Sequence, residues 1–566
     1  MFKNKIKEII NSKYFNFIFI ISINLIFFII CNMIFQLRYE TVDDFTIMKI
    51  ISKLDGTYSY YSIYIHPVLT FFIMLLYKTG ININWYTFLL LTLQFISFSL
   101  IGIILLNKNK RTGTLFYLMI ILTLWSNLLL TINYTSVAAI LILSGIISIL
   151  YYLESNRKRY RNIGLILITI GTMLRWKSII ISLPFYIIYV VICAIKKQYN
   201  PLKILFCIIV IFLLVFVSDK IIYNINPIYK EYTKFNDVRT YFFDSNVLDY
   251  DKYKNILKDN GWTYNDWKVF YTYSFADENY YNFEKLSMLY ECVQEGKVET
   301  DKIIYTAKLL CFYIKEVYLI YFIGVILIIL LSYLLDKNKG IISIYFLLYL
   351  FINYVLCYTK PVFRVIMPLF ATTIIMMIYM IIDKKYNDDE SKLVEKIKDI
   401  LIIFFIMIYI ILNIIITYNS VSKYNKKNFE LVKEVINYTS NNKENAYVYP
   451  NVLSNISLAY SIYEKIPDNT FSNLYHMGDW DIYTKEYYDF KERYNIENIM
   501  TDLYQKDNLY IISGNVYGAN NKKYSNHIDT IVEYIKEHYN EDIKYKVIKE
   551  FSNSIKIYKI YKEMEK

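Results

Sequence analysis

Two adjacent carboxylates, Asp43 and Asp44, follow the first apolar run of the sequence. Most such pairs in a solvated loop carry no chemistry. Here, however, His66 and Pro67 open a short apolar stretch further along, which predicts a loop folded against a membrane surface, with His66 as a contact of an interfacial helix. A partly desolvated carboxylate suits general-base work. We therefore interpret Asp43 and Asp44 as candidate catalytic residues, and favour Asp44 as the base because it lies one residue further into the loop.

Basic side chains at two predicted helix ends form a second group of candidates. Arg175 and Arg364 lie where membrane topology does not call for positive charge, and each has a lysine nearby, Lys177 and Lys360 respectively. A guanidinium binds phosphate through a planar fork, so these four residues are interpreted as a donor phosphate site. The alternative is that the side chains only reach toward lipid head groups.

A polar and aromatic cluster lies in the C-terminal part of the chain. It contains His476, Asp479 and Trp480. Aromatic faces beside carboxylates suit sugar binding, although a structural turn would explain the same residues. Asn473, Gly478 and Asp481 belong to the same stretch, and the pairs Asp266–Trp267 and Asp277–Glu278 are weaker versions of it. His527 and His538 lack the spacing of zinc ligands. The sequence therefore identifies no metal ligands.

The composition shows what must position these residues. The chain has 566 residues, of which 56% are hydrophobic, with apolar runs that are too long for a soluble protein. Its formal net charge of +12 collects in short loops between those runs. This pattern is a topology signal, and it predicts contact with membrane lipids and no nucleic-acid partner.

The apolar runs predict a polytopic α-helical membrane protein of about eleven transmembrane helices, because each run can cross about 30 Å of hydrocarbon. The runs lie near residues 14–36, 84–106, 114–131, 133–153, 163–195 (a pair), 202–218, 317–335, 340–358, 364–382 and 400–418. The stretch from His66 to Tyr77 is too short to span, so we expect it to lie at the interface.

The basic loops predict a multi-pass cell-membrane protein with a cytoplasmic N-terminus, since this orientation alone places every strongly basic short loop in the cytoplasm. It divides 163–195 into two helices that meet near Trp176. This orientation also places three polar regions outside the cytoplasm: a loop at 37–65, a larger loop at 218–315, and the C-terminal tail after Tyr418. The predicted domains are a membrane domain at 1–418 and an extracytoplasmic soluble α/β domain at 419–566. The tail alternates amphipathic stretches with short strand-like runs at Ala446–Tyr449, Leu509–Ser513 and Ile555–Tyr561.

The sequence contains, in this order, a first helix, a loop opening with an acidic pair, a short helix led by a basic residue and proline, and the entry Asn84-Trp85-Tyr86 to the next helix. Together these features resemble the GT-C superfamily of membrane glycosyltransferases. The resemblance covers the membrane part to about residue 418. It implies an inverting transfer of a sugar from a polyprenyl-phosphate donor to an acceptor on the outer face. It also leaves room for a divalent cation held by the acidic pair, since some members use one.

The sequence therefore favours an inverting glycosyltransferase that modifies a cell-envelope glycan or teichoic polymer. In this hypothesis the aspartate pair accepts the proton of the acceptor hydroxyl, and the arginines stabilise the departing phosphate. A polymerase or ligase that uses a lipid-diphosphate oligosaccharide is one alternative. A lipid or glycan transporter is another, although the mid-helix charges and repeats typical of transporters are almost absent from the sequence.

Overall fold

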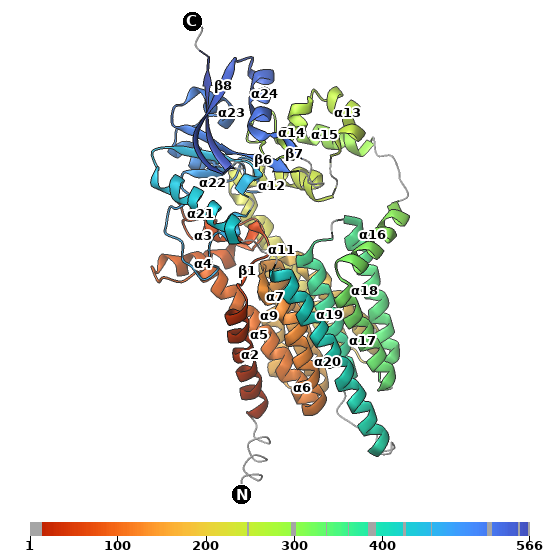
Figure 1. Cartoon of the computed structure of the whole chain (residues 1–566). Helices are drawn as coiled ribbons and strands as arrows, with labels where there is room; N and C mark the ends of the chain where they lie inside the picture. Colours follow the sequence, from red (N-terminus) through yellow and green to blue (C-terminus); the bar gives the residue numbers. More distant parts are fainter. Residues whose placement is uncertain are drawn as a thin grey trace.

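The structure is a computed structural model that describes residues 14–245, 248–295, 302–335, 337–359, 361–382, 392–422, 426–453, 455–517, 523–552 and 555–563. A bundle of long helices forms one half of the molecule, and shorter helices and a sheet form the other half (Figure 1). We call the end of the bundle that carries the sheet the domain end, and the opposite end the basic end.

Within the described ranges, nine helices are long and apolar enough to cross a membrane. They are Phe15–Ile34 (α2), Trp85–Lys108 (α5), Lys110–Leu130 (α6, η1 and α7), Tyr134–Ser155 (α8), Trp176–Ile195 (η2 and α10), Asn200–Ile225 (α11), Lys339–Tyr358 (within α18, Lys339–Thr359), Phe363–Ile381 (α19) and Ile400–Asn419 (within α20, Lys392–Ser422). These helices are compatible with a multi-pass membrane protein.

The sequence predicted about eleven spans, so two predicted spans are not among these nine helices. Both regions lie within the described residues and are helical, but neither contains a single apolar helix long enough to span. Lys302–Glu316 (α16) and Leu319–Leu334 (α17) are bent by 90° relative to each other, and they make a tenth span only if they are counted together. Lys158–Leu174 (α9) has 17 residues, and its first turn is basic, which shortens its apolar part. The count of eleven therefore becomes nine or ten by length and composition.

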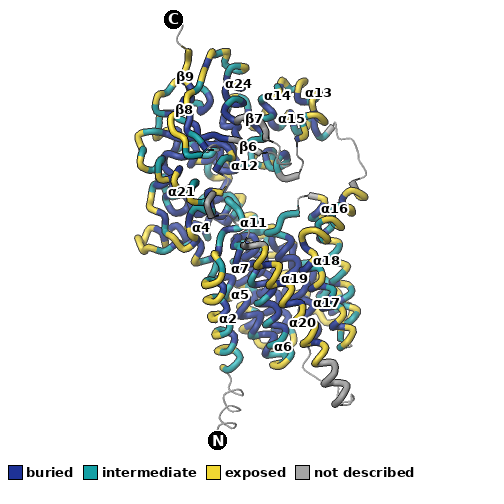
Figure 2. Tube along the Cα trace, viewed as in Figure 1, coloured by how far each residue is buried: buried dark blue, intermediate teal, exposed yellow. Residues whose placement is uncertain are grey.

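Burial separates the inner helices from the outer ones. Most residues of α8 and α19 are buried, whereas α2 and α11 leave most of their apolar side chains exposed (Figure 2). Phe206 and Leu214 on α11 are each 66% exposed. An apolar face of this size is stable in contact with lipid, so α2 and α11 have the character of lipid-facing helices.

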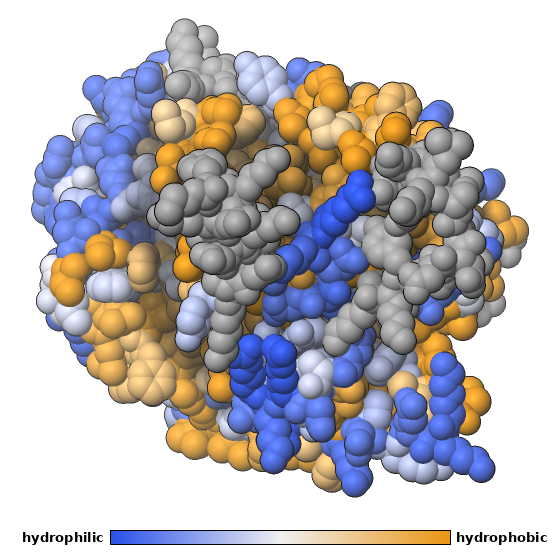
Figure 3. Space-filling model, turned by 90° about the horizontal axis from the view of Figure 1, so that it is seen from below, coloured by the Kyte–Doolittle hydropathy of each residue, from blue (hydrophilic) through white to orange (hydrophobic). Residues whose placement is uncertain are grey.

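Polar contacts join the start of α2 to several loops at the basic end. Asn16 donates a hydrogen bond to Asn107 over 2.9 Å. Lys108 forms an ion pair of 2.9 Å with Glu154 and also donates to the carbonyl of Tyr379. Seen from this end, hydrophilic residues gather near the centre and along the lower edge of the face, with hydrophobic residues among and above them (Figure 3). The loops predicted to share one side of the membrane thus lie together.

The segment after α2 folds over the domain end. A two-residue strand, Arg38–Tyr39 (β1), pairs in parallel with Thr131–Ile132 (β2). Two short helices follow, Val42–Ile51 (α3) and Pro67–Lys78 (α4). The apolar α4 has 12 residues, too few to span, as the sequence predicted. The later polar region forms Pro227–Thr240 (α12), Tyr241–Ser245 (η3), Tyr250–Asp259 (α13), Tyr264–Tyr271 (α14) and Phe283–Glu295 (α15).

The C-terminal part contains a five-stranded sheet in the order β4-β3-β5-β9-β8. Its strands are Ala446–Tyr449 (β3), Leu474–His476 (β4), Leu509–Ser513 (β5), Ile543–Ser552 (β8) and Ile555–Lys562 (β9). The first three are parallel, and β9 and β8 are antiparallel. The remaining elements are Lys426–Asn441 (α21), Asn451–Leu453 (η4), Ile456–Leu458 (η5), Lys485–Arg493 (α22), Ile499–Gln505 (α23), Asn515–Tyr517 (β6), Lys523–Asn526 (β7) and His527–Tyr539 (α24). The three strand-like runs predicted from the sequence are strands.

Two glycines allow α8 and α9 to pack in close contact. A Cβ on Gly145 would lie 2.7 Å from the carbonyl oxygen of Gly164, and a Cβ on Gly164 would lie 2.7 Å from that of Gly145. Small residues at such a crossing let two backbones approach within a membrane.

We predict that Gly145→Val lowers the thermal midpoint of the detergent-solubilised protein, because the added methyl groups force the two helices apart at a cost of about 1–3 kcal/mol. Gly340→Val is the matched control, since a Cβ there meets nothing within 4 Å. Equal thermal midpoints for the two variants would show that this crossing does not limit stability.

Candidate functional site

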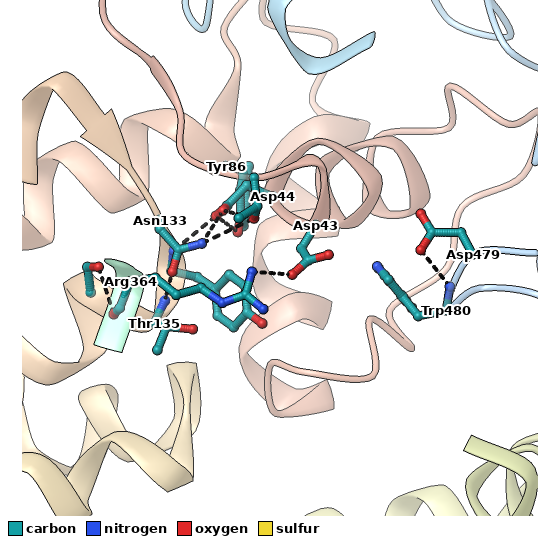
Figure 4. A network of polar contacts seen from close by, with 11 residues as sticks. Asp43, Asp44, Tyr86, Asn133, Thr135, Arg364, Asp479 and Trp480 are labelled. Atoms are coloured by element: carbon teal, nitrogen blue, oxygen red, sulfur yellow. Dashed lines mark hydrogen bonds and ion pairs between the residues drawn. The ribbon is translucent and has the colours of Figure 1, made fainter. Parts of the chain in front are cut away.

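Asp44 is a buried, fully hydrogen-bonded carboxylate. One oxygen accepts hydrogen bonds from the Tyr86 hydroxyl and the Tyr134 backbone N–H, each over 2.9 Å. The other accepts from the amide of Asn133 over 2.6 Å (Figure 4). Burial raises the pKa of Asp44 to about 8, and the bonds from Tyr134 and Tyr86 oppose that rise. With no exposed surface, this side chain ties α3 to the starts of α5 and α8.

Asp43 points in a different direction from its neighbour, because successive residues on an α-helix are about 100° apart. Its carboxylate forms an ion pair of 2.7 Å with Arg364 at the start of α19. The two side chains remain 16% and 28% exposed respectively. Asp43 therefore faces open space, and the geometry favours it over Asp44 for contact with a substrate.

That open space is a cavity of about 320 Å³, which we call the aspartate cavity. Asp43 lines it from α3, and His476, Asp479 and Trp480 line it from the C-terminal part. Figure 4 shows Asp43 between Arg364 on one side and Asp479 with Trp480 on the other. The structure thus brings Asp43 together with the cluster that the sequence proposed for sugar binding, although the two are more than 400 residues apart.

Buried charges hold the C-terminal part against α3. Lys49 lies 3.3 Å from Asp55 and 3.8 Å from Asp481, and all three are buried. The backbone adds two hydrogen bonds, from Asn469 N–H to the Lys53 carbonyl and from Phe471 N–H to the Leu54 carbonyl. Breaking a buried ion pair leaves an unpaired charge, so this contact fixes the position of Asp481 and its neighbours relative to Asp43.

Burial also sets the protonation of groups around the aspartate cavity. It raises the pKa of Asp479 to about 6 and that of Glu40 to about 7, and Arg364 opposes the rise at Glu40. Burial lowers the pKa of His476 to about 4, so this imidazole is neutral at pH 7. His476 accepts a hydrogen bond from the Gly478 N–H, which fixes one ring nitrogen as an acceptor.

A second cavity of about 320 Å³, the arginine cavity, adjoins the first. Arg175, Lys177 and Lys220 line it together with the acidic Asp219 and Asp237. Tyr64 and Arg364 line both cavities. Three of the four predicted phosphate-binding residues, Arg175, Lys177 and Arg364, therefore lie around one space, whereas Lys360 lies outside the described residues.

The remaining predicted residues have structural contacts. His66 caps α4 by accepting from the Val68 N–H, and its other ring nitrogen lies 3.0 Å from the Ser218 hydroxyl. It lines neither cavity. Asn473 donates to three carbonyls near α21, and a Cβ on Gly478 would collide with the Tyr273 backbone.

Most side chains singled out in the large polar region join it to the C-terminal part. Asp266 completes a capping box at α14 and accepts from His538 over 2.5 Å. Asp277 accepts hydrogen bonds from Asn498, Tyr534 and Tyr539. Trp267 donates to the Leu248 carbonyl, Glu278 pairs with Lys491, and His527 bonds to Ser274. Among the described residues, no group of three side chains is arranged to hold a metal ion.

Sequence reasoning missed Glu40, Lys49 and Tyr64. Glu40 lies three residues before Asp43, just ahead of α3, and a third carboxylate so close to the pair was a usable signal. The lysine-rich and tyrosine-rich composition, with 61 tyrosines, hid the other two.

No protein-family model matches this sequence, and none of the curated proteins is similar enough to match it.

We predict that Asp44→Ala destabilises the protein more than Asp43→Ala. The first change leaves three buried donors without an acceptor, at a combined cost of about 3 kcal/mol or more, whereas the second removes a half-exposed ion pair. Thermal unfolding of both variants in the same detergent measures the difference. Equal midpoints would contradict the structural role of Asp44.

Proposed function

We propose that this protein is an inverting glycosyltransferase of the GT-C type that moves a sugar from a polyprenyl-phosphate donor to a cell-envelope glycan or teichoic acceptor. One observation carries the proposal. The Asp43–Arg364 pair lies where a cavity rich in aspartate and aromatic side chains meets a cavity lined by basic ones. A sugar phosphate needs these two environments on either side of the bond that breaks.

The proposed reaction is a direct displacement. Asp43 accepts the proton of the acceptor hydroxyl as that oxygen attacks the anomeric carbon. The bond between the anomeric carbon and the phosphate oxygen breaks, and its electron pair leaves with the lipid phosphate. Arg364 and Arg175 stabilise the charge on the phosphate, and Lys177 adds to the field. A single displacement inverts the anomeric centre.

Arg364 has two partners in this mechanism. Without substrate it pairs with Asp43 over 2.7 Å. A donor phosphate in the arginine cavity competes for the same guanidinium, which has enough donors for both. Arrival of the donor therefore loosens the hold on Asp43 and makes its carboxylate available to the acceptor.

The aspartate cavity offers polar groups suited to sugar hydroxyls. The indole N–H of Trp480 is buried and has no hydrogen-bond partner among the described residues. The same holds for the carboxylate oxygens of Asp481, which lies 3.8 Å from Lys49. Buried polar atoms are normally paired, so such atoms around a cavity support binding of a polar ligand. Tyr449 and Trp480 add aromatic surface.

The proposed location is the cell membrane, with the basic end in the cytoplasm and the domain end outside. The joined basic loops at one end of the bundle support this orientation.

We predict that a reporter active only outside the cytoplasm works when it is fused after Lys566. The same reporter placed after Lys196, in a basic loop, is the control and should be silent. The reverse pattern would reject the orientation.

We predict that Asp43→Asn abolishes the activity without unfolding the protein, since loss of a general base typically costs on the order of 10² to 10⁴ in rate. The measurement is the sugar composition of envelope polymers from a deletion strain that carries each variant. Asp507→Asn, an exposed carboxylate away from both cavities, is the matched control. Parental composition with Asp43→Asn would remove Asp43 from the chemistry. No change on deletion of the protein itself would reject the proposed function.

A further inference from the structure

Tyr64 is a wall shared by the two cavities. Its ring lies under the guanidinium of Arg175, which is 4.8 Å from the ring centroid, on the arginine-cavity side. On the other side its ring meets the ring of Trp480 edge-on, with centroids 4.9 Å apart. The stacked ring of Tyr134 supports it. Tyr64 thus contacts both Arg175 of the arginine cavity and Trp480 of the aspartate cavity.

The backbone before Tyr64 is strained. Ile63 has a φ of 65°, in the left-handed region that a β-branched residue rarely adopts. The Tyr64 N–H donates to the Ser62 carbonyl over 2.7 Å and closes a tight turn around it. Strain of this kind persists only where surrounding structure over-determines it, and it is concentrated at functional sites.

The surroundings of the turn supply that constraint. The Ile63 N–H donates to the hydroxyl of Tyr223 on α11 over 2.8 Å. The ring of Tyr61 stacks on that of Tyr229 with centroids 4.2 Å apart. Both partners belong to a small buried cluster of tyrosines in α11 and α12. The end of α11 and the adjoining α12 therefore hold the turn, and the turn holds Tyr64 between the cavities.

We propose that Tyr64 is the positioning residue that aligns the phosphate half and the sugar half of the site. Its ring fixes the plane of the Arg175 guanidinium through a cation–π contact, and its edge contact fixes Trp480 at the matching height. The inference rests on the proposed function. It adds that the alignment depends on the aromatic ring, whereas the hydroxyl of Tyr64 takes no part.

The experiment uses the full-length protein in nanodiscs and two readouts. The first is binding of geranylgeranyl phosphate, which carries no sugar, by calorimetry. The second is the sugar composition of envelope polymers in the complemented deletion strain. The variants are Tyr64→Phe, Tyr64→Leu and Arg175→Lys, with the double variant of the last two. Tyr58→Leu is the matched control, because Tyr58 is half-buried in the same segment and lines neither cavity.

We expect Tyr64→Phe and Tyr58→Leu to match the parent in both readouts. Tyr64→Leu should weaken binding of the probe by about threefold to tenfold, as expected for loss of a cation–π contact, and should lower sugar transfer further. Arg175→Lys keeps the charge and removes the planar group, so its effect should be smaller in the Tyr64→Leu background than in the parent.

Two results would overturn the inference while leaving the proposed function intact: parental binding and transfer in Tyr64→Leu, or fully additive losses in the double variant. If Tyr64→Leu fails to fold, a deficit in Tyr64→Phe equal to that of Arg175→Lys overturns it, because the hydroxyl would then carry the effect. A parent that neither binds geranylgeranyl phosphate nor alters envelope sugars rejects the proposed function instead.

Discussion

An ion pair of 2.7 Å between Arg364 and Asp43 joins the central helix α19 of the bundle to the first polar segment. The carbonyl of Arg364 also accepts a hydrogen bond from Ser136 on α8, so the arginine is anchored in the most buried part of the bundle. The side chain of Arg364 lines both cavities. The pair therefore lies where the two cavities meet, and in the proposed mechanism it sets where the donor phosphate approaches the carboxylate.

Asp43 can occupy this position because Asp44 anchors the helix that carries it. Three donors from α5 and α8 hold the Asp44 carboxylate in a buried site, which fixes the rotation of α3 about its axis. The buried contacts of Lys49 with Asp55 and Asp481 then dock the C-terminal part on the other side of the same helix. A short helix is thus fixed from two directions, and its one half-exposed carboxylate is directed into the cavity between them.

Much of the architecture could be predicted from the sequence. Apolar length and basic loops predicted the helices, the division of 163–195 and the short α4, because the bilayer imposes a fixed length and a charge asymmetry. The strands of the C-terminal part followed from local pattern. The association of Asp43 with Asp479 and Trp480 could not be predicted, since it depends on long-range docking. The sequence also could not show that Asp43 lines the cavity while Asp44 is buried beside it, because loop position does not reveal the direction of two adjacent side chains.

The most direct test of the account is a cryo-electron microscopy structure of the protein in nanodiscs with geranylgeranyl phosphate. We expect phosphate density in the arginine cavity, within hydrogen-bonding distance of Arg175 and Arg364, with the guanidinium of Arg364 turned from Asp43 toward the phosphate. Phosphate density at another place on the protein, with the Asp43–Arg364 pair unchanged, would contradict it.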